Sequence, residues 1–215
     1  IKNIPNYTTK NINFVYLRYL NKQSVLSIMS EITTLCFSGG GTRGISFLGS
    51  LKCLIQNKII DLKKITKFVG SSAGAILSFL LSLNYSIEDL EEFILNFNLS
   101  KLNDNIDIDN IFYNYGLDNG IKITYLIQKF LEKRTSKFDI TFQELYQFNK
   151  KTLIVSSTCI TDKTVKYFSH TLTPKVSVIL ALRMSISIPF FFSPIVFQGK
   201  YYVDGSLMDN YPIHL

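Results

Sequence analysis

One serine lies in a setting that can turn its hydroxyl into a nucleophile. Ser72 stands between Gly70 and Gly74 in the spacing G-x-S-x-G, where an apolar strand-like stretch meets an apolar helix-like stretch. A sharp strand-to-helix turn of this kind projects the serine hydroxyl out of the sheet, and small flanking residues let other backbone pass closely. The start of the following helix also favours negative charge beside the serine. We therefore predict that Ser72 is a nucleophile, rather than part of an ordinary small-residue turn.

A glycine-rich run after the first strand-like stretch is the second candidate. It comprises Gly39, Gly40, Gly41, Thr42, Arg43 and Gly44. The same spacing occurs in dinucleotide-binding loops, but those expect an acidic residue at the end of the second strand. Here that strand ends in Val69 and Gly70, and Asp61 lies before it. We interpret the run as an oxyanion hole of unshielded backbone amides, in which Arg43 holds the loop or contacts a phosphate unless it forms a surface ion pair.

The third candidate is a carboxylate, Asp204, followed by Gly205. An aspartate with its usual pKa near 3.9 is a weak base, so it would need partial desolvation or would accept a proton only as attack proceeds. Alone, Asp-Gly is a turn signal, and it gains weight from the other two motifs. A triad of Ser72, Asp204 and His214 is an alternative, because this chain order is that of α/β-hydrolases.

The elements that must position these residues can be read from the apolar pattern. Residues 33–37 and 65–69 are strand-like, and residues 45–55 and 73–83 have helical spacing. Two strand–turn–helix units in succession predict an α/β fold with a parallel sheet whose loops meet at the carboxyl ends of the strands. Further along, residues 153–157 and 165–168 are strand-like, Thr173-Pro174 predicts a helix start, and a hairpin of residues 195–197 and 201–203 leads to Asp204.

Composition narrows the class of protein. The chain has 215 residues, of which 47% are hydrophobic, and a net charge of +7. This suits one folded domain and an anionic partner, and the scattered lysines disfavour nucleic acid. Cys36, Cys53 and Cys159 form no paired motif, which favours buried thiols in a reducing compartment. With only His170 and His214 available, we expect no metal site and no cofactor.

No targeting or membrane-spanning segment is visible, and we expect an intracellular protein with possible peripheral membrane association. The longest apolar run, residues 75–83, is too short to span a bilayer, and no signal-peptide pattern is present. We expect residues 1–31 to be an N-terminal segment of uncertain role and residues 32–215 to form one domain that continues in the natural protein. The Asn- and Asp-rich residues 103–120 are a candidate lid.

Taken together and in order, these motifs resemble the patatin-like phospholipase family over residues 32–215. The matching parts are residues 39–44, 70–74 and 204–206, with a proline-bearing block from Ala181 to Ser185 and Ile188 to Pro194. The resemblance implies a single α/β domain of three layers with a mostly parallel central sheet. It also implies a Ser72–Asp204 dyad without histidine or metal, an oxyanion loop, and phospholipase A-type hydrolysis of fatty-acyl esters through an acyl-Ser72 intermediate.

The same resemblance implies phospholipid or neutral lipid as substrate, contact with a membrane surface, and no nucleic-acid partner; any protein activator is unspecified. Ser206 departs from the family, which more often has Gly or Ala there, and its hydroxyl is expected to bind Asp204 and lower its basicity. Phe190, Phe191 and Phe192 either line an acyl channel or belong to the core. A non-catalytic lipid- or nucleotide-binding module remains the alternative from another class.

Overall fold

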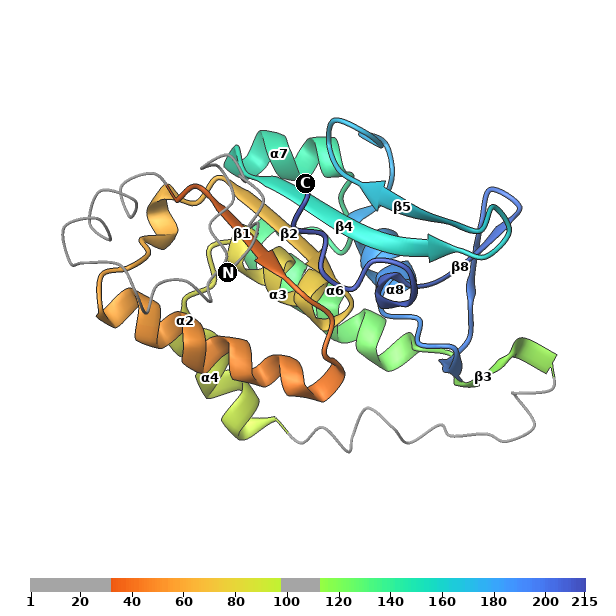
Figure 1. Cartoon of the computed structure of the whole chain (residues 1–215), viewed down its shortest axis with the longest axis horizontal. Helices are drawn as coiled ribbons and strands as arrows, with labels where there is room; N and C mark the ends of the chain where they lie inside the picture. The colour runs from red at the N-terminus through yellow and green to blue at the C-terminus, as the bar shows by residue number, and fades with distance from the viewer. Residues whose placement is uncertain (1–31, 98–112) are drawn as a thin grey trace, which may run out of the picture.

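The computed structural model describes residues 32–97 and 113–215, in which helices flank a six-stranded sheet (Figure 1). The strands are β1 (Thr34–Phe37), β2 (Lys67–Ser71), β3 (Gly116–Asp118), β4 (Thr152–Cys159), β5 (Thr164–Phe168), β6 (Phe190–Phe192), β7 (Ile195–Phe197) and β8 (Lys200–Asp204). The helices are α2 (Ser46–Gln56), α3 (Ala73–Ser82), α4 (Ile87–Asn96), α6 (Ile121–Thr135), α7 (Phe142–Asn149) and α8 (Val178–Ser185), with short 3-10 helices η2 (Gly41–Ile45), η3 (Leu62–Lys64) and η5 (Gly205–Leu207). The predicted α/β class is confirmed.

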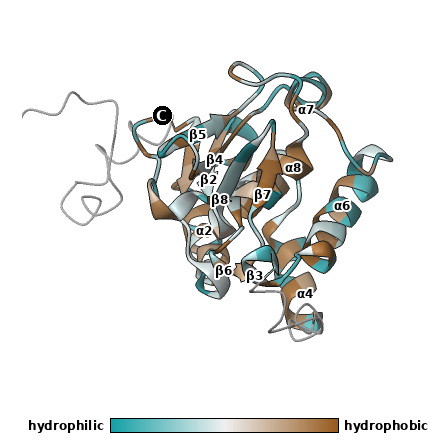
Figure 2. Ribbon diagram, turned by 90° about the vertical axis from the view of Figure 1, so that its right-hand side faces the viewer, coloured by the Kyte–Doolittle hydropathy of each residue, from teal (hydrophilic) through white to brown (hydrophobic). Residues whose placement is uncertain are grey.

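The sheet is mixed, with the order β1-β2-β4-β8-β7. Strands β1, β2 and β4 are parallel, as the two strand–turn–helix units predict, whereas β5 and β8 run antiparallel to β4. The predicted hairpin β7–β8 is present, and the two strand-like stretches at 153–157 and 165–168 pair as a second antiparallel hairpin, β4–β5. A separate two-stranded sheet joins β3 to β6, and the two strands lie side by side in Figure 2.

Strand β4 is long enough to hold two strands on one edge. Its first part, residues 152–156, pairs with β2, and its last part, residues 157–159, pairs with β8. Because β5 pairs with residues 155–159, it occupies the opposite edge. Ser71 at the end of β2 therefore faces Ser156, while Asp204 at the end of β8 faces the next residue, Ser157. Since β2 and β8 run toward each other, their last residues meet.

The core lies between the sheet and the helices that pack on it. Helix α3 is apolar around most of its circumference, and eight of its ten residues are buried, as expected for a helix enclosed in a domain interior. It packs on β1, β2 and β4, while α8 packs on β4 and β8. Figure 2 shows α6, α7 and α8 on one side of the sheet. These contacts place the N-terminus of α3 and the C-terminus of α8 at the point where β2 and β8 meet.

Most predicted boundaries agree with the structure, and one is wrong. The helices expected at residues 45–55 and 73–83 are α2 and α3, each within a residue of the predicted bounds. The helix expected from Thr173-Pro174 begins only at Val178, with Ser177 as the N-cap. Backbone carbonyls at Pro174 and Val176 instead accept hydrogen bonds from the first residues of α7, and this pairing holds the segment outside the helix.

Two expectations fall wholly or partly outside the described residues. Residues 1–31 lie outside them, as does most of the candidate lid at 103–120, whose last part contains β3. Within the described ranges, none of the helices combines the length and the hydropathy that a transmembrane span requires.

Gly74 and Gly49 offer a matched test of the packing at the start of α3. A Cβ atom on Gly74 would lie 2.5 Å from the carbonyl oxygens of Phe37 and Ser38, whereas one on Gly49 in α2 would meet nothing within 4 Å. We expect Gly74→Ala to lower the free energy of unfolding by about 1–3 kcal/mol. Gly49→Ala should raise it by up to about 1 kcal/mol, the helix preference for alanine. Chemical denaturation measures both, and equal effects would contradict this packing.

Candidate active site

The structure brings Ser72 and Asp204 into direct contact. The Ser72 hydroxyl donates a hydrogen bond of 2.6 Å to Oδ2 of Asp204. The second carboxylate oxygen, Oδ1, accepts a hydrogen bond of 2.8 Å from the amide of Ser206. Both side chains are buried, with Ser72 5% and Asp204 3% exposed. Two residues that are 132 positions apart in sequence thus form a buried hydrogen-bonded pair, the arrangement in which a carboxylate can accept a proton from a hydroxyl.

The backbone at Ser72 is held in a costly conformation. Its φ is +51° and its ψ is −125°, a region that non-glycine residues seldom adopt and that costs on the order of 1–3 kcal/mol. The flanking glycines make the turn possible. A Cβ on Gly70 would lie 2.3 Å from the carbonyl oxygen of Gly74, and a Cβ on Gly74 would strike the end of β1. The two predicted elbow glycines therefore allow the close crossing on which the position of Ser72 depends.

The C-terminal end of α8 contacts both members of the pair. The Ser185 hydroxyl accepts a hydrogen bond of 2.9 Å from the amide of Ser72, and the carbonyl of Ser187 accepts one of 2.8 Å from the amide of Asp204. Sequence reasoning assigned neither serine a role. Ser185 lies in the proline-bearing block, but neither residue type nor spacing indicates that this block turns back onto the elbow.

A buried arginine holds this end of α8 in place. Arg183 is 4% exposed and donates hydrogen bonds of 2.8 Å to the Ser187 hydroxyl and 3.0 Å to the carbonyl of Asn119. Burial lowers the pKa of the guanidinium from 12.5 to about 10, and the nearby carboxylate of Asp118 opposes that shift. The arginine stays charged at neutral pH and ties the residues beside Asp204 to the segment that follows β3.

The glycine-rich run lies against the elbow, with its residues in different roles. The amide of Gly39 donates to the carbonyl of Asn210, and that of Arg43 donates to Gly40. In the described part of the chain, the amides of Gly40, Gly41 and Thr42 have no hydrogen-bond acceptor. Gly41 has a φ of +53°, a left-handed conformation that favours glycine. These three amides begin the 3-10 helix η2 and are available to bind an anion.

Other residues of the run serve packing. A Cβ on Gly39 would lie 2.0 Å from the Ser206 hydroxyl, and one on Gly44 would lie 3.0 Å from Cβ of Ala73. The run is thereby fixed between η5 and the start of α3. Arg43 is exposed and forms no ion pair with any residue in the described ranges.

Burial changes the acidity of Asp204. Desolvation raises the pKa of its carboxyl above the ordinary 3.8, and hydrogen bonds from Ser72 and Ser206 oppose the rise. A raised pKa makes the carboxylate a better proton acceptor than an exposed aspartate. The Ser206 amide and, to a smaller extent, the Ser206 side chain both lower the pKa of Asp204, in the direction expected for that hydroxyl. The same hydroxyl also lies 3.3 Å from the hydroxyl of Ser71.

Neither histidine belongs to this site. The ring of His214 is 3.3 Å from the Tyr167 hydroxyl, which donates its hydrogen bond to Asp209. His170 stacks on Tyr146 at a centroid distance of 3.9 Å. Since the polar neighbours of His214 are Tyr167 and Asp209 rather than Asp204, the geometry does not form the alternative triad.

The cysteines are free, and the described ranges hold no cluster of His, Cys, Asp and Glu suited to a metal ion. Cys159 is buried as predicted and Cys36 is half-buried, where desolvation raises the pKa of its thiol to about 12. Cys53 is exposed, and the prediction of a buried thiol there is wrong, because it faces away from the core side of α2.

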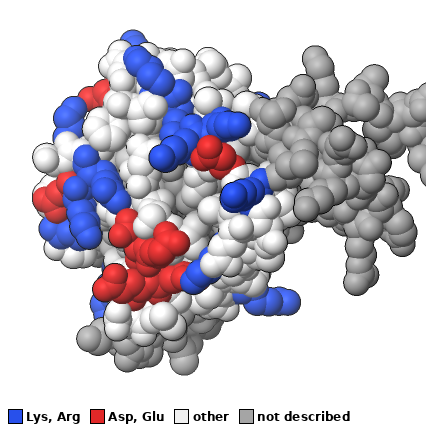
Figure 3. Space-filling view, turned by 90° about the vertical axis from the view of Figure 1, so that its left-hand side faces the viewer, with Lys and Arg blue, Asp and Glu red and all other residues white. Residues whose placement is uncertain are grey.

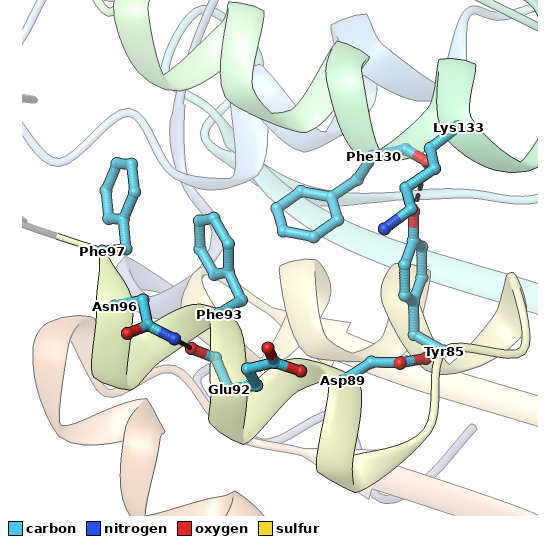
Figure 4. Close-up of a pocket in the computed structure, with 8 residues that line it drawn as sticks. All are labelled: Tyr85, Asp89, Glu92, Phe93, Asn96, Phe97, Phe130 and Lys133. Atoms are coloured by element: carbon cyan, nitrogen blue, oxygen red, sulfur yellow. Dashed lines mark hydrogen bonds between the residues drawn. The ribbon is translucent and has the colours of Figure 1, made fainter.

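A distinct pocket lies away from the dyad, between α4 and α6. It has a volume of about 320 Å³, and Figure 4 shows aromatic side chains beside two carboxylates. Its lining comprises Tyr85, Asp89, Glu92, Phe93, Asn96, Phe97, Phe130 and Lys133. Phe93 and Phe130 pack edge to face with centroids 4.8 Å apart, so each ring already has an aromatic neighbour within the protein. None of the lining residues belongs to the elbow, the glycine-rich run or the end of β8.

Comparison with known sequences agrees with this arrangement. The model of the patatin-like phospholipase family matches residues 35–215. The chain is 31% identical over 207 residues to a probable lipid hydrolase of Invertebrate iridescent virus 6, covering 94% of this chain and 70% of that protein. It is also 31% identical over 188 residues to an uncharacterized protein of Acanthamoeba polyphaga mimivirus, covering 86% of this chain and 62% of that protein.

Two solved structures share the fold. VipD from Legionella pneumophila superposes with a TM-score of 0.65 at 19% identity, over 82% of this chain and 46% of that one. ExoU from Pseudomonas aeruginosa, crystallised with SpcU, gives a TM-score of 0.56 at 20% identity, over 73% of this chain and 38% of that one. The chain thus spans less than half the length of either structure and 62% of the mimivirus protein.

Ser185 provides a test of how Ser72 is positioned. Ser185→Ala leaves the buried amide of Ser72 without an acceptor, which costs about 1–3 kcal/mol, and lets the strained turn relax. We expect the rate at which a fluorophosphonate modifies Ser72 to fall roughly tenfold, the equivalent of about 1.4 kcal/mol. Ser82→Ala is the matched control, because Ser82 is a buried helical serine whose hydroxyl donates to the carbonyl of Phe79 within α3. If both variants lose reactivity equally, Ser185 has no positioning role.

Proposed function

The chain belongs to the patatin-like phospholipase family, and on that premise we propose that it hydrolyses fatty-acyl esters of lipids through an acyl-Ser72 intermediate. The observation that carries the proposal is the 2.6 Å hydrogen bond from the Ser72 hydroxyl to Asp204. A buried serine bonded directly to a carboxylate with a raised pKa is an activated nucleophile that needs no histidine.

The first half of the proposed reaction forms the acyl-enzyme. Ser72 Oγ attacks the ester carbonyl while its proton passes to Asp204. The unpartnered amides of Gly40, Gly41 and Thr42 donate hydrogen bonds to the oxyanion, and each such donor is worth about 3 kcal/mol in other enzymes. The tetrahedral intermediate then collapses. The C–O bond to the alcohol breaks, and the protonated Asp204 returns its proton to the departing alcohol.

The second half releases the fatty acid. A water molecule occupies the position vacated by the alcohol, loses a proton to Asp204, and attacks the acyl carbonyl under the same amides. The bond from the acyl carbon to Ser72 Oγ breaks, and Asp204 returns the proton to the serine. Each turnover therefore consumes one ester and one water, yields one fatty acid and one alcohol, and restores both residues.

The similarity to a probable lipid hydrolase supports a lipid substrate. We propose phospholipase A-type cleavage of phospholipid, with neutral lipid as the related possibility, in contact with a membrane surface. We propose the same activity for the whole natural protein, in which residues 32–215 would form the catalytic domain.

Loss of labelling by a fluorophosphonate probe tests the nucleophile and the base separately. We expect the probe to modify Ser72, with no adduct in Ser72→Ala. Asp204→Asn should lower the labelling rate by at least about a hundredfold, the usual contribution of a general base. His214→Ala is the control. A Ser72–Asp204 dyad predicts that the probe still labels this variant, whereas a triad with His214 predicts that labelling is lost. An unlabelled wild-type protein, even with lipid vesicles present, would favour the alternative of a non-catalytic binding module.

The pH dependence follows from the raised pKa of Asp204. The base must be ionised to accept the proton of Ser72, so kcat/KM should fall as the pH drops through the pKa of the folded protein. Because burial raises that pKa, the midpoint of the acid limb should lie above the ordinary value of 3.8. Hydrolysis of a soluble p-nitrophenyl ester, measured across the acid range where the fold is intact, checks this. A midpoint at or below 3.8 would contradict the burial of Asp204 in the working enzyme.

A further inference from the structure

Five apolar side chains are exposed on segments that are joined to the dyad, and we call them the apolar rim. They are Tyr115, Ile188, Phe190, Leu207 and Met208. Such side chains scattered singly over a surface are normal, whereas their concentration at one place marks an interaction site. The apolar rim therefore needs a physical explanation.

Hydrogen bonds at Asp204 place the apolar rim beside the dyad. Ile188 follows Ser187, whose carbonyl accepts the amide of Asp204 at 2.8 Å. Leu207 and Met208 follow Ser206, whose amide donates to the carboxylate of Asp204. Both segments leave the buried pair and reach the surface within a few residues.

Strand pairing adds the two aromatic members. Phe190 begins β6 and pairs with Gly116 of β3, which follows Tyr115 directly. Figure 2 shows β3 and β6 together at this end of the molecule. The members of the apolar rim thus come from segments that are held to the dyad or to one another.

The two aromatic members are held in strained backbone. Phe190 has a φ of +65° and Tyr115 a φ of +57°, and the left-handed region costs a non-glycine residue on the order of 1–2 kcal/mol. The strain brings no burial, since Phe190 remains 70% exposed and Tyr115 64% exposed. Because the strained positions hold two rings in an exposed place, they favour a function for those rings. The alternative that Phe190 belongs to the core is wrong, because its side chain is exposed.

Charge is distributed unevenly along the molecule. Residues 184–199, which include Ile188 and Phe190, contain no Asp, Glu, Lys, Arg or His. The opposite end of the sheet, where β2 and β4 begin, carries Lys63, Lys64, Lys150 and Lys151. Figure 3 shows that end, with many basic and acidic side chains on its surface. Water therefore solvates the lysine-bearing end well, while the exposed part of residues 184–199 can lose water at little electrostatic cost.

We propose that the apolar rim docks the chain on a lipid surface, with the dyad facing the lipid. The inference rests on the proposed function, because the ester of a membrane lipid lies at such a surface. Aromatic rings such as Phe190 and Tyr115 favour the boundary between headgroups and acyl chains, and Ile188, Leu207 and Met208 add apolar area. The uncharged segment makes the attraction hydrophobic, independent of anionic headgroups.

Binding without turnover tests this docking surface. The Ser72→Ala chain is mixed with neutral phosphatidylcholine vesicles in high salt, and its partition is measured by co-sedimentation. Adding Phe190→Ser and Met208→Ser should weaken binding by roughly tenfold or more, since both side chains lose their apolar contact. The matched control adds Phe138→Ser and Phe148→Ser, two other exposed phenylalanines, and should bind within about twofold of the parent.

Amide hydrogen exchange gives a second measurement that needs no rim substitution. In the Ser72→Ala chain, vesicles should slow exchange at residues 186–190 and 205–208, and leave residues 58–64 unchanged. Equal binding by the rim and control variants, or no slowing at the rim, overturns the proposal. Slowing that depends on protein concentration without vesicles also overturns it, because a second copy would then cover the rim.

The outcomes separate docking from the proposed function. If the wild-type chain cleaves a soluble ester in a Ser72-dependent manner but its Ser72→Ala form ignores vesicles, the docking surface is wrong and the hydrolase stands. If vesicles bind through the apolar rim but neither soluble nor vesicle ester is cleaved, the proposed function is wrong.

Discussion

The hydrogen bond between Ser72 and Asp204 depends on the way β4 holds two strands end to end on one edge. The β2 strand reaches the position opposite Ser156 and β8 reaches the position opposite Ser157, so the register of two backbone ladders fixes where Ser72 and Asp204 meet. A slip of one residue in β8 would turn Asp204 to the other face of the sheet. The rest of the site is built around that junction.

Two features of the site are energetically costly, the backbone conformation of Ser72 and the burial of Asp204, and several contacts stabilise them. The positive φ of Ser72 is held by the hydrogen bond from its amide to the Ser185 hydroxyl. The close crossing of the backbone at Gly70 and Gly74 supports the same conformation. The carboxylate of Asp204 is buried at the cost of its solvation, which two donors partly offset. Arg183 fixes the segment that contacts both residues. Helix α8 therefore positions the reacting groups without supplying either of them.

The sequence predicted the local parts of this arrangement better than the long-range ones. The turn at Ser72 and the hairpin before Asp204 were predictable because apolar periodicity and glycine spacing are local signals. Ser185 and Ser187 were missed because a serine near a helix end has many roles, and only the tertiary fold brings α8 to the elbow. The helix boundary at Thr173 was wrong because pairing of the Pro174 and Val176 carbonyls with α7 prevailed over a local proline signal.

Dehydration would connect the proposed chemistry to the proposed lipid surface. Burial already raises the pKa of Asp204, and a bound lipid surface would remove more of the water near the dyad. In a drier site the proton of Ser72 passes more readily to the carboxylate, and hydrogen bonds from the amides of Gly40 and Gly41 to an oxyanion become stronger. The same exclusion must end before deacylation, since water is the second reactant. Reversible docking through the apolar rim, as we propose, satisfies both requirements.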